Sequence, residues 1–196
     1  MRLSPGRWLN AQMHLLSWLG EDLHGESFRA EQSPQGRSVV VRILHAEACR
    51  TSAYIERFRR VAERAMLLSH RHTAVVHALG ILPGPSPGSS DSGYAPAGDY
   101  GSGRGEAGGS SGGIPWIATD PIEGPDLRSY LAEGLSPAAL APLLLPVADL
   151  LDRAAALGLC HGELAPTNLI LVSEPQSVPR LVLLDLGLAK VLATDL

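Results

Sequence analysis

The 196-residue chain is poor in aromatic residues, cysteine and positive charge, and each scarcity excludes a class of protein. Aromatic residues make up 5% of the chain and apolar residues 45%, so its core must be aliphatic. The net charge of −4 lacks the basic excess that nucleic-acid-binding proteins usually carry. Cys49 and Cys160 are too few for a disulfide framework or a zinc cluster, and they are typical of a reducing cytoplasm.

Long hydrophobic runs are also missing from the chain. The most apolar stretch, 138–148, is about half the ~20 residues that a membrane span needs, and Pro142 and Pro146 interrupt it. The N-terminus has no sustained apolar run and therefore does not predict a secretory signal. We expect a cytoplasmic protein that does not insert into a membrane.

One segment, 83–113, differs in composition from everything around it. Of its 31 residues, 22 are glycine, serine or proline, and its bulkier apolar side chains are Tyr94 and Tyr100. Such a segment buries too little surface to offset its ordering entropy. We therefore expect it to be disordered, either as a linker between domains or as an insertion at a surface turn.

The rest of the chain alternates between patterns that are typical of strands and of helices. Short apolar, β-branched runs predict strands at 38–44, 74–82, 114–119, 169–172 and 181–184. Apolar residues at helical spacing predict helices at 51–69, 125–132 and 137–157. The last of these helices has Ser136 as its expected N-cap and Pro137 in its first turn, and Gly158 ends it.

Two groups of residues could carry chemistry. Gly20 and Gly25 fit a hairpin loop whose backbone N–H groups approach phosphate, although alone they favour a plain hairpin. Asn168 and Asp185 carry oxygens that suit a hard divalent cation, and Glu163 suits the acceptance of a proton from a hydroxyl. Asn and Asp also favour ordinary turns, so these residues taken singly fit structural roles as well.

The order of the elements is more specific than any one of them. A glycine hairpin, an apolar strand, a helix, a strand leading to a hinge and a long helix occur in succession. They are followed by the loop at His161, two short strands and Asp185-Leu186-Gly187. This succession resembles the eukaryotic-like Ser/Thr protein kinase domain of bacteria over about residues 15–192.

The resemblance implies an α+β, protein-kinase-like fold. Residues 1–124 would form the N-lobe, an antiparallel sheet plus one helix, together with the hinge at 119–124. The 83–113 segment would then be an insertion in this lobe. Residues 125–196 would form an incomplete helical C-lobe that ends soon after Gly187.

The resemblance also implies roles for individual residues. Gly20, Gly25 and Arg42 would face the phosphates of a nucleotide, and Thr119, Asp120 and Ile122 would hold its adenine. Glu163 takes the position of the proton acceptor. Asn168 and Asp185 take the positions of the Mg²⁺ ligands, so all three are candidate catalytic residues.

Several positions depart from the pattern of the family. Asp22 replaces the middle glycine of the hairpin, and a carboxylate there would repel phosphates. Arg42 replaces the strand lysine, and the two residues are not interchangeable in a tight site. Val61 replaces the helix glutamate that pairs with that lysine, Ala165 replaces the loop lysine, and Glu163 replaces an aspartate.

These departures predict a pseudokinase, a binding or regulatory module for a protein partner that binds ATP with Mg²⁺ weakly or not at all. One alternative is a weakly active Ser/Thr protein kinase that uses Glu163 as its base. A second alternative is a small-molecule phosphotransferase, because the His161-Gly162-Glu163 loop is similar to that of aminoglycoside kinases.

Further expectations concern charge and burial. Arg42 is expected to carry an unpaired charge, for which Asp185 is the nearest plausible partner. We expect His70 and His72 to face solvent, and Cys160 to be a small buried apolar residue.

Overall fold

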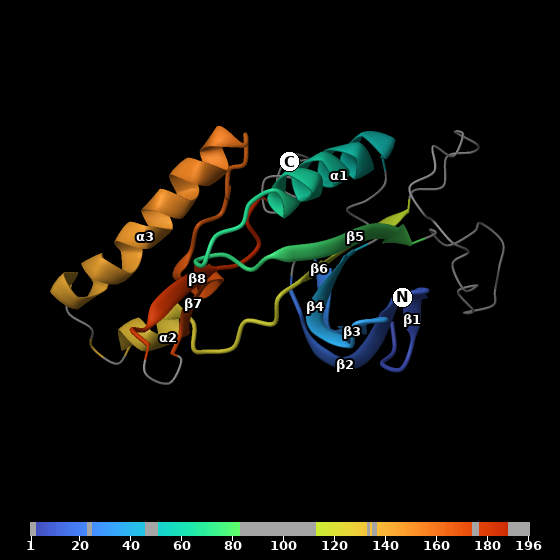
Figure 1. Ribbon diagram of the computed structural model, residues 1–196, viewed down its shortest axis with the longest axis horizontal. Coiled ribbons are helices and arrows are strands. Elements are labelled where there is room, and N and C mark those ends of the chain that lie inside the picture. The colour runs from blue at the N-terminus through green and yellow to red at the C-terminus, as the bar shows by residue number, and fades with distance from the viewer. Residues whose placement is uncertain are drawn as a thin grey trace. The chain divides into compact units, whose positions relative to one another are not determined.

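The computed structural model describes residues 3–22, 25–45, 51–82, 113–132, 134, 137–173 and 177–187 (Figure 1). The chain divides into two compact units. Met1–Arg57 and Ala78–Thr119 form the first unit, and Phe58–His77 and Asp120–Leu196 form the second. Apart from Gly113, the expected insertion at 83–113 lies outside the described residues.

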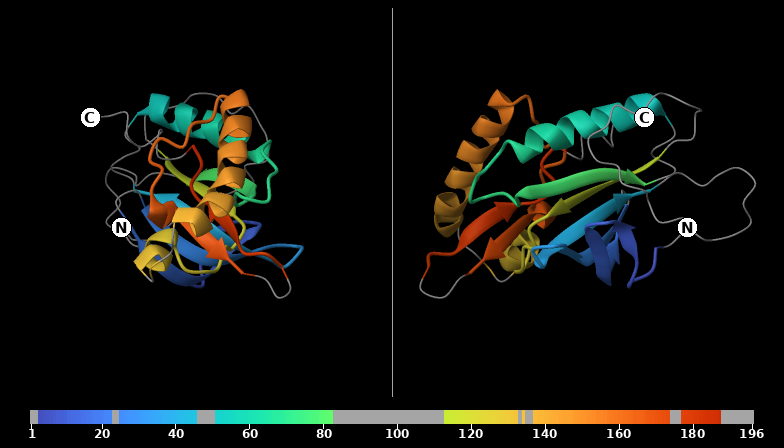
Figure 2. Two further views of the ribbon diagram at one scale, coloured as in Figure 1. Left: turned by 90° about the vertical axis from the view of Figure 1, so that its left-hand side faces the viewer. Right: turned by 45° about the vertical axis from the view of Figure 1, so that its right-hand side comes forward.

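A six-stranded sheet with the order β1-β2-β3-β4-β6-β5 characterises the first unit (Figure 2). Each pair from β1 to β4, and the pair β4–β6, is antiparallel. The strands are β1 (Trp8–Asn10), β2 (Met13–Glu21), β3 (Gly25–Gln32), β4 (Arg37–Leu44), β5 (Val76–Leu82) and β6 (Ile114–Thr119).

The register of the sheet separates its two faces. Phe28, Val41 and Ala118 lie opposite one another on three neighbouring strands, and all three are fully buried in the core of the first unit. That core consists of Leu3, Leu9, Met13, Leu15, Phe28, Ala30, Val39, Val41, Ile43, Leu82, Trp116 and Ala118. Because successive side chains on a strand point to opposite faces, Arg42 lies on the other face of β4.

The second unit contains the end of α1, two further helices and a hairpin. Its elements are α1 (Ser52–Met66, from Phe58 onward), α2 (Leu127–Ala132), α3 (Pro137–Ala156), the 3₁₀ turn Pro166–Asn168, β7 (Leu169–Val172) and β8 (Arg180–Leu183). The antiparallel β7–β8 hairpin packs against α3 and α2 (Figures 1 and 2). Among the described residues, no helix combines the length and the apolar character that crossing a bilayer requires.

The predicted strands and helices are present with small shifts at their ends. α1 ends at Met66 rather than at residue 69, because Leu67 and Leu68 donate N–H groups three residues back in a tight turn. α2 begins at Leu127 because the Asp126 carboxylate caps it, accepting from Ser129 N–H at 2.7 Å. The expected cap at Ser136 lies outside the described residues.

Strand β8 is bonded to the segment that follows α1. Leu183 N–H donates to the His72 carbonyl (2.8 Å), and the Thr73 hydroxyl donates to the Leu183 carbonyl (3.2 Å). His72 Nδ1–H donates to the Leu181 carbonyl at 2.7 Å. His72 is only 6% exposed, so the expectation that it faces solvent is wrong. The ring is buried because its Nδ1–H reaches the carbonyl of Leu181, which lies on the buried strand β8.

The expectation for Cys160 is also wrong. Cys160 is exposed, whereas its neighbours Leu159 and His161 are buried. In the turn that ends α3, where Leu159 N–H donates to the Ala154 carbonyl at 2.9 Å, Leu159 takes the position in the core.

The burial of His72 predicts a pH dependence of stability. Burial lowers the pKa of His72 below its ordinary 6.5, and the nearby His70, Arg71 and Arg180 lower it further against the Leu181 hydrogen bond. As the pH falls below about 6.5, the unfolded state therefore binds this proton before the folded state does, and stability is lost. His72→Asn keeps an N–H donor and lacks this proton. Denaturant unfolding at pH 7.5 and 5.5 measures the free energy of unfolding of both proteins. Between these pH values the parent should lose more of it than His72→Asn does. Equal losses would contradict the prediction.

Candidate functional site

The residues that the sequence marks as functional fall into both compact units. Gly20, Gly25, Arg42 and Thr119 belong to the first unit, and Asp120, Ile122, Glu163, Asn168 and Asp185 to the second.

Gly20 and Gly25 stand at the two strand ends of the β2–β3 hairpin but differ in their surroundings. A Cβ added to Gly25 would lie 2.2 Å from the Ile43 carbonyl oxygen on β4, which no side chain tolerates. A Cβ added to Gly20 would meet nothing within 4 Å. Gly25 is therefore required by close packing of the sheet, whereas Gly20 is not.

Arg42 is paired within the first unit. Its Nη2 forms an ion pair and hydrogen bond with the Asp22 Oδ2 at the end of β2. The expectation that Arg42 carries an unpaired charge is therefore wrong. Asp22 had been expected only to repel phosphates, and its contact with Arg42 could not be read from the sequence because 20 residues separate the two.

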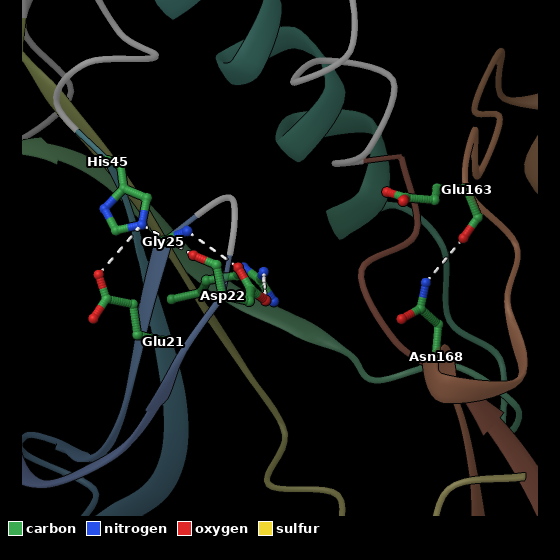
Figure 3. Close-up of polar contacts among 7 residues, drawn as sticks. Glu21, Asp22, Gly25, His45, Glu163 and Asn168 are labelled. Carbon is green, nitrogen blue, oxygen red and sulfur yellow. Dashed lines mark hydrogen bonds and ion pairs between the residues drawn. The ribbon is translucent and has the colours of Figure 1, made fainter. Parts of the chain in front are cut away.

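Several hydrogen bonds hold Asp22 in place (Figure 3). Its backbone N–H donates to the Gly25 carbonyl (3.0 Å), and its Oδ1 accepts from Gly25 N–H (3.2 Å). Its carbonyl accepts from His45 Nε2 at 3.0 Å, and that nitrogen also lies 3.7 Å from Glu21 Oε1. The hairpin end is thus fixed from both strands and from the end of β4.

Thr119 is the last residue of β6 and pairs in register with Val40 on β4. Asp120, where the chain re-enters the second unit, forms hydrogen bonds through its side chain as well as its backbone. Its Oδ1 accepts from His77 Nε2 (2.6 Å), its Oδ2 accepts from Val75 N–H (3.2 Å), and its own N–H donates to the Val75 carbonyl (3.1 Å).

These bonds fix the backbone that leads to Ile122, which is half-buried. The pair of His77 and Asp120 has no signature in the sequence, because no local pattern joins residues 43 positions apart.

The loop after α3 is tied to the end of β8 through a buried histidine. His161 Nδ1 accepts from Glu163 N–H (3.3 Å), and because this nitrogen accepts, Nε2 carries the proton that it donates to the Leu184 carbonyl (3.0 Å). Leu184 N–H in turn donates to the Asn168 carbonyl at 2.9 Å. The loop and the strand end are therefore held by one chain of hydrogen bonds.

Asn168 is oriented by the backbone of Glu163. Its Nδ2 donates to the Glu163 carbonyl (2.9 Å), and Figure 3 shows the Glu163 carboxylate pointing away from this amide. Since only the amide nitrogen can donate to a carbonyl, the Asn168 oxygen is the atom turned away from that contact. Asn168 therefore presents the kind of atom that binds Mg²⁺.

Asp185 follows β8 with a φ of +53°, the only positive φ among the described non-glycine residues. Such backbone conformations are concentrated at functional sites. The carboxylate of Asp185 and the oxygen of Asn168 are two donors of the type that Mg²⁺ uses beside phosphate and water oxygens. Both residues therefore carry the kind of oxygen that suits Mg²⁺.

Val61 lies in an apolar environment on α1. It packs against the second core, and a Cβ added to Gly187 would lie 2.8 Å from its Cγ1 and 3.3 Å from Leu159 Cδ2. Glu63, two residues along the helix, is exposed. The helix position that would supply a carboxylate in the resembling family is thus occupied by part of the hydrophobic core.

No protein-family model matches the chain. In sequence it is similar to the Ser/Thr protein kinases Pkn1 of Myxococcus xanthus (24% identical over 176 residues) and PknF of Mycobacterium tuberculosis (26% over 175 residues). It is also similar to the probable Ser/Thr protein kinase PkwA of Thermomonospora curvata (30% over 189 residues). These matches cover 90%, 87% and 95% of the chain. The chain spans only 21%, 31% and 20% of the three proteins.

Among solved structures, the crystal structure of the PknI kinase domain of Mycobacterium tuberculosis matches with a TM-score of 0.71 and 23% sequence identity. The match covers 96% of this chain and 64% of that domain. The chain therefore has an incomplete protein kinase fold, and its relatives in sequence are bacterial Ser/Thr protein kinases. The resemblance and the fold class predicted from the sequence are confirmed.

The two hairpin glycines should respond differently to substitution. Gly25→Ala forces a clash with the backbone of β4 and should lower the free energy of unfolding by roughly 1–3 kcal/mol. Gly20→Ala meets open space and should change it by less than about 0.5 kcal/mol. Urea unfolding of both variants measures the difference, and equal effects would show that Gly25 is not closely packed.

Val61→Glu should destabilise the protein, because it places a carboxylate within an apolar cluster. We expect a loss of about 1–3 kcal/mol, or several degrees in Tm. Ala53→Glu adds the same residue at an exposed position of the same helix and should change Tm little. A Val61→Glu variant as stable as Ala53→Glu would contradict the assigned packing of Val61.

Proposed function

We propose that this chain is a pseudokinase, a catalytically impaired protein-kinase-like domain that acts as a binding or regulatory module for a protein partner and binds nucleotide weakly or not at all. The observation that carries the proposal is the partner of Arg42. In this chain Arg42 on β4 is paired with the carboxylate of Asp22, from the hairpin. In protein kinases that carboxylate would come from the helix, at the position where this chain has the apolar Val61.

Charge placement supports an impaired phosphotransfer site. Positioning and charge stabilisation supply most of the catalysis in phosphoryl transfer, and a 1 Å misplacement can cost about 100-fold in rate. Asp22 adds a negative charge where phosphates would bind, and Glu163 is one methylene longer than the aspartate it replaces. Ala165 also lacks the charge of the loop lysine.

One set of contacts favours the alternative, a weakly active Ser/Thr protein kinase. Asn168 is held with its amide oxygen turned away from the Glu163 carbonyl, and the loop around Glu163 is anchored through His161. On this alternative, Glu163 would be the proton acceptor, and Asn168 and Asp185 would supply the oxygens that bind the metal. A base at Glu163 would accept the proton of a substrate hydroxyl, which is worth typically about 10²–10⁴-fold in rate.

A transfer assay with purified protein, MgATP and generic protein substrates separates the two functions. We expect phosphate incorporation no higher than that of Glu163→Ala. Glu63→Ala, which removes an exposed carboxylate from α1, serves as the matched control. Incorporation that Glu163→Ala abolishes and Glu63→Ala retains would overturn the pseudokinase proposal in favour of the kinase. An aminoglycoside substrate in a parallel arm tests small-molecule transfer.

A further inference from the structure

The contacts of Asp22 resemble those that proteins offer to a phosphate group. One carboxylate oxygen, Oδ1, accepts from the backbone N–H of Gly25, and the other, Oδ2, contacts the guanidinium of Arg42. A backbone N–H next to a guanidinium is a donor set that recognises phosphate oxygens. Here both donors are occupied by an anion that the chain itself supplies.

The burial of the Arg42 side chain strengthens its contact with Asp22. The Arg42 side chain is 14% exposed, whereas that of Asp22 is 51% exposed. A guanidinium that is largely removed from water gains more from an adjacent anion than an exposed one does. Asp22 is the more exposed member of the pair. An anion that approaches Arg42 from solvent must therefore compete with the Asp22 carboxylate.

The backbone around Asp22 keeps the carboxylate in this position. Its N–H and carbonyl are bonded to the Gly25 carbonyl and to His45 Nε2, at 3.0 Å each. A side chain whose backbone is already fixed loses less entropy when it forms a contact than a free anion does. The internal carboxylate therefore has an advantage over a phosphate group in solution.

We propose that Asp22 is an autoinhibitory anion, which occupies Gly25 N–H and Arg42 in place of a phosphate group, so that a phosphate-bearing ligand must displace it to bind the first unit. This inference rests on the proposed function in that it gives a physical cause for weak nucleotide binding. It concerns anion binding only and requires no phosphoryl transfer.

The test compares the binding of inorganic tripolyphosphate to the full chain by isothermal titration calorimetry. Asp22→Asn removes the competing charge but keeps an oxygen that accepts from Gly25 N–H, so the hairpin is retained. We expect it to bind tripolyphosphate about tenfold more tightly than the parent. Glu31→Gln removes one exposed charge near the far end of β3 and should bind within about twofold of the parent.

Two more variants keep the proposal falsifiable. Asp22→Gly removes the carboxylate from Gly25 N–H and from Arg42, and it should bind tripolyphosphate at least as tightly as Asp22→Asn does. It replaces the asparagine variant in the test if that variant does not fold. Adding Arg42→Gln to Asp22→Asn should abolish the gain. Equal affinities of the parent, Asp22→Asn and Glu31→Gln, or a gain that survives Arg42→Gln, would overturn the proposal.

The outcome is separable from that of the proposed function. A parent protein that transfers phosphate in a Glu163-dependent way would overturn the pseudokinase proposal and leave the ranking of tripolyphosphate affinities unaffected. An inactive parent whose variants all bind tripolyphosphate equally would overturn the role of Asp22 alone.

Discussion

Strand β8 is the element on which the second unit depends. Leu181, Val182 and Leu183 on this strand are fully buried, which is possible for a short strand only when its polar backbone groups find partners away from water. On one side β8 pairs with β7, and on the other it bonds with His72 and Thr73. Through these bonds the end of α1, the loop at His161 and the turn at Asp185 are all positioned by one buried strand.

In the first unit, the sheet contains a cationic side chain, that of Arg42. Arg42 lies on a central strand opposite the apolar core, flanked in register by Ser27 and Ile117. A guanidinium in such a place needs an anion, and the structure supplies it from the adjacent hairpin. The ion pair joins Arg42 on β4 to Asp22 at the end of β2, so both of its members belong to the first unit. A kinase-like fold can thus be stable with Val61 at the helix position.

The candidate site residues of the two units differ in how their contacts depart from the pattern of protein kinases. In the second unit, Asn168 and His161 keep a well-connected loop, and Asp185 keeps an unusual backbone conformation. In the first unit, Asp22 and Arg42 form an ion pair in place of the glycine and the lysine of the family pattern. The departures therefore change the charged contacts of the first unit more than the backbone contacts of the second.

The elements and their order follow from local features of the sequence, because apolar periodicity, glycines and prolines act over a few residues. The strand at 114–119 and the helix that starts at Pro137 were predicted to within a residue at each end. The order of motifs also determined the kinase-like fold. Only the tertiary structure decided which charges meet and which side chains are buried. The contact of Arg42 with Asp22 and the burial of His72 depend on segments that are far apart in sequence, and no local pattern specifies such contacts.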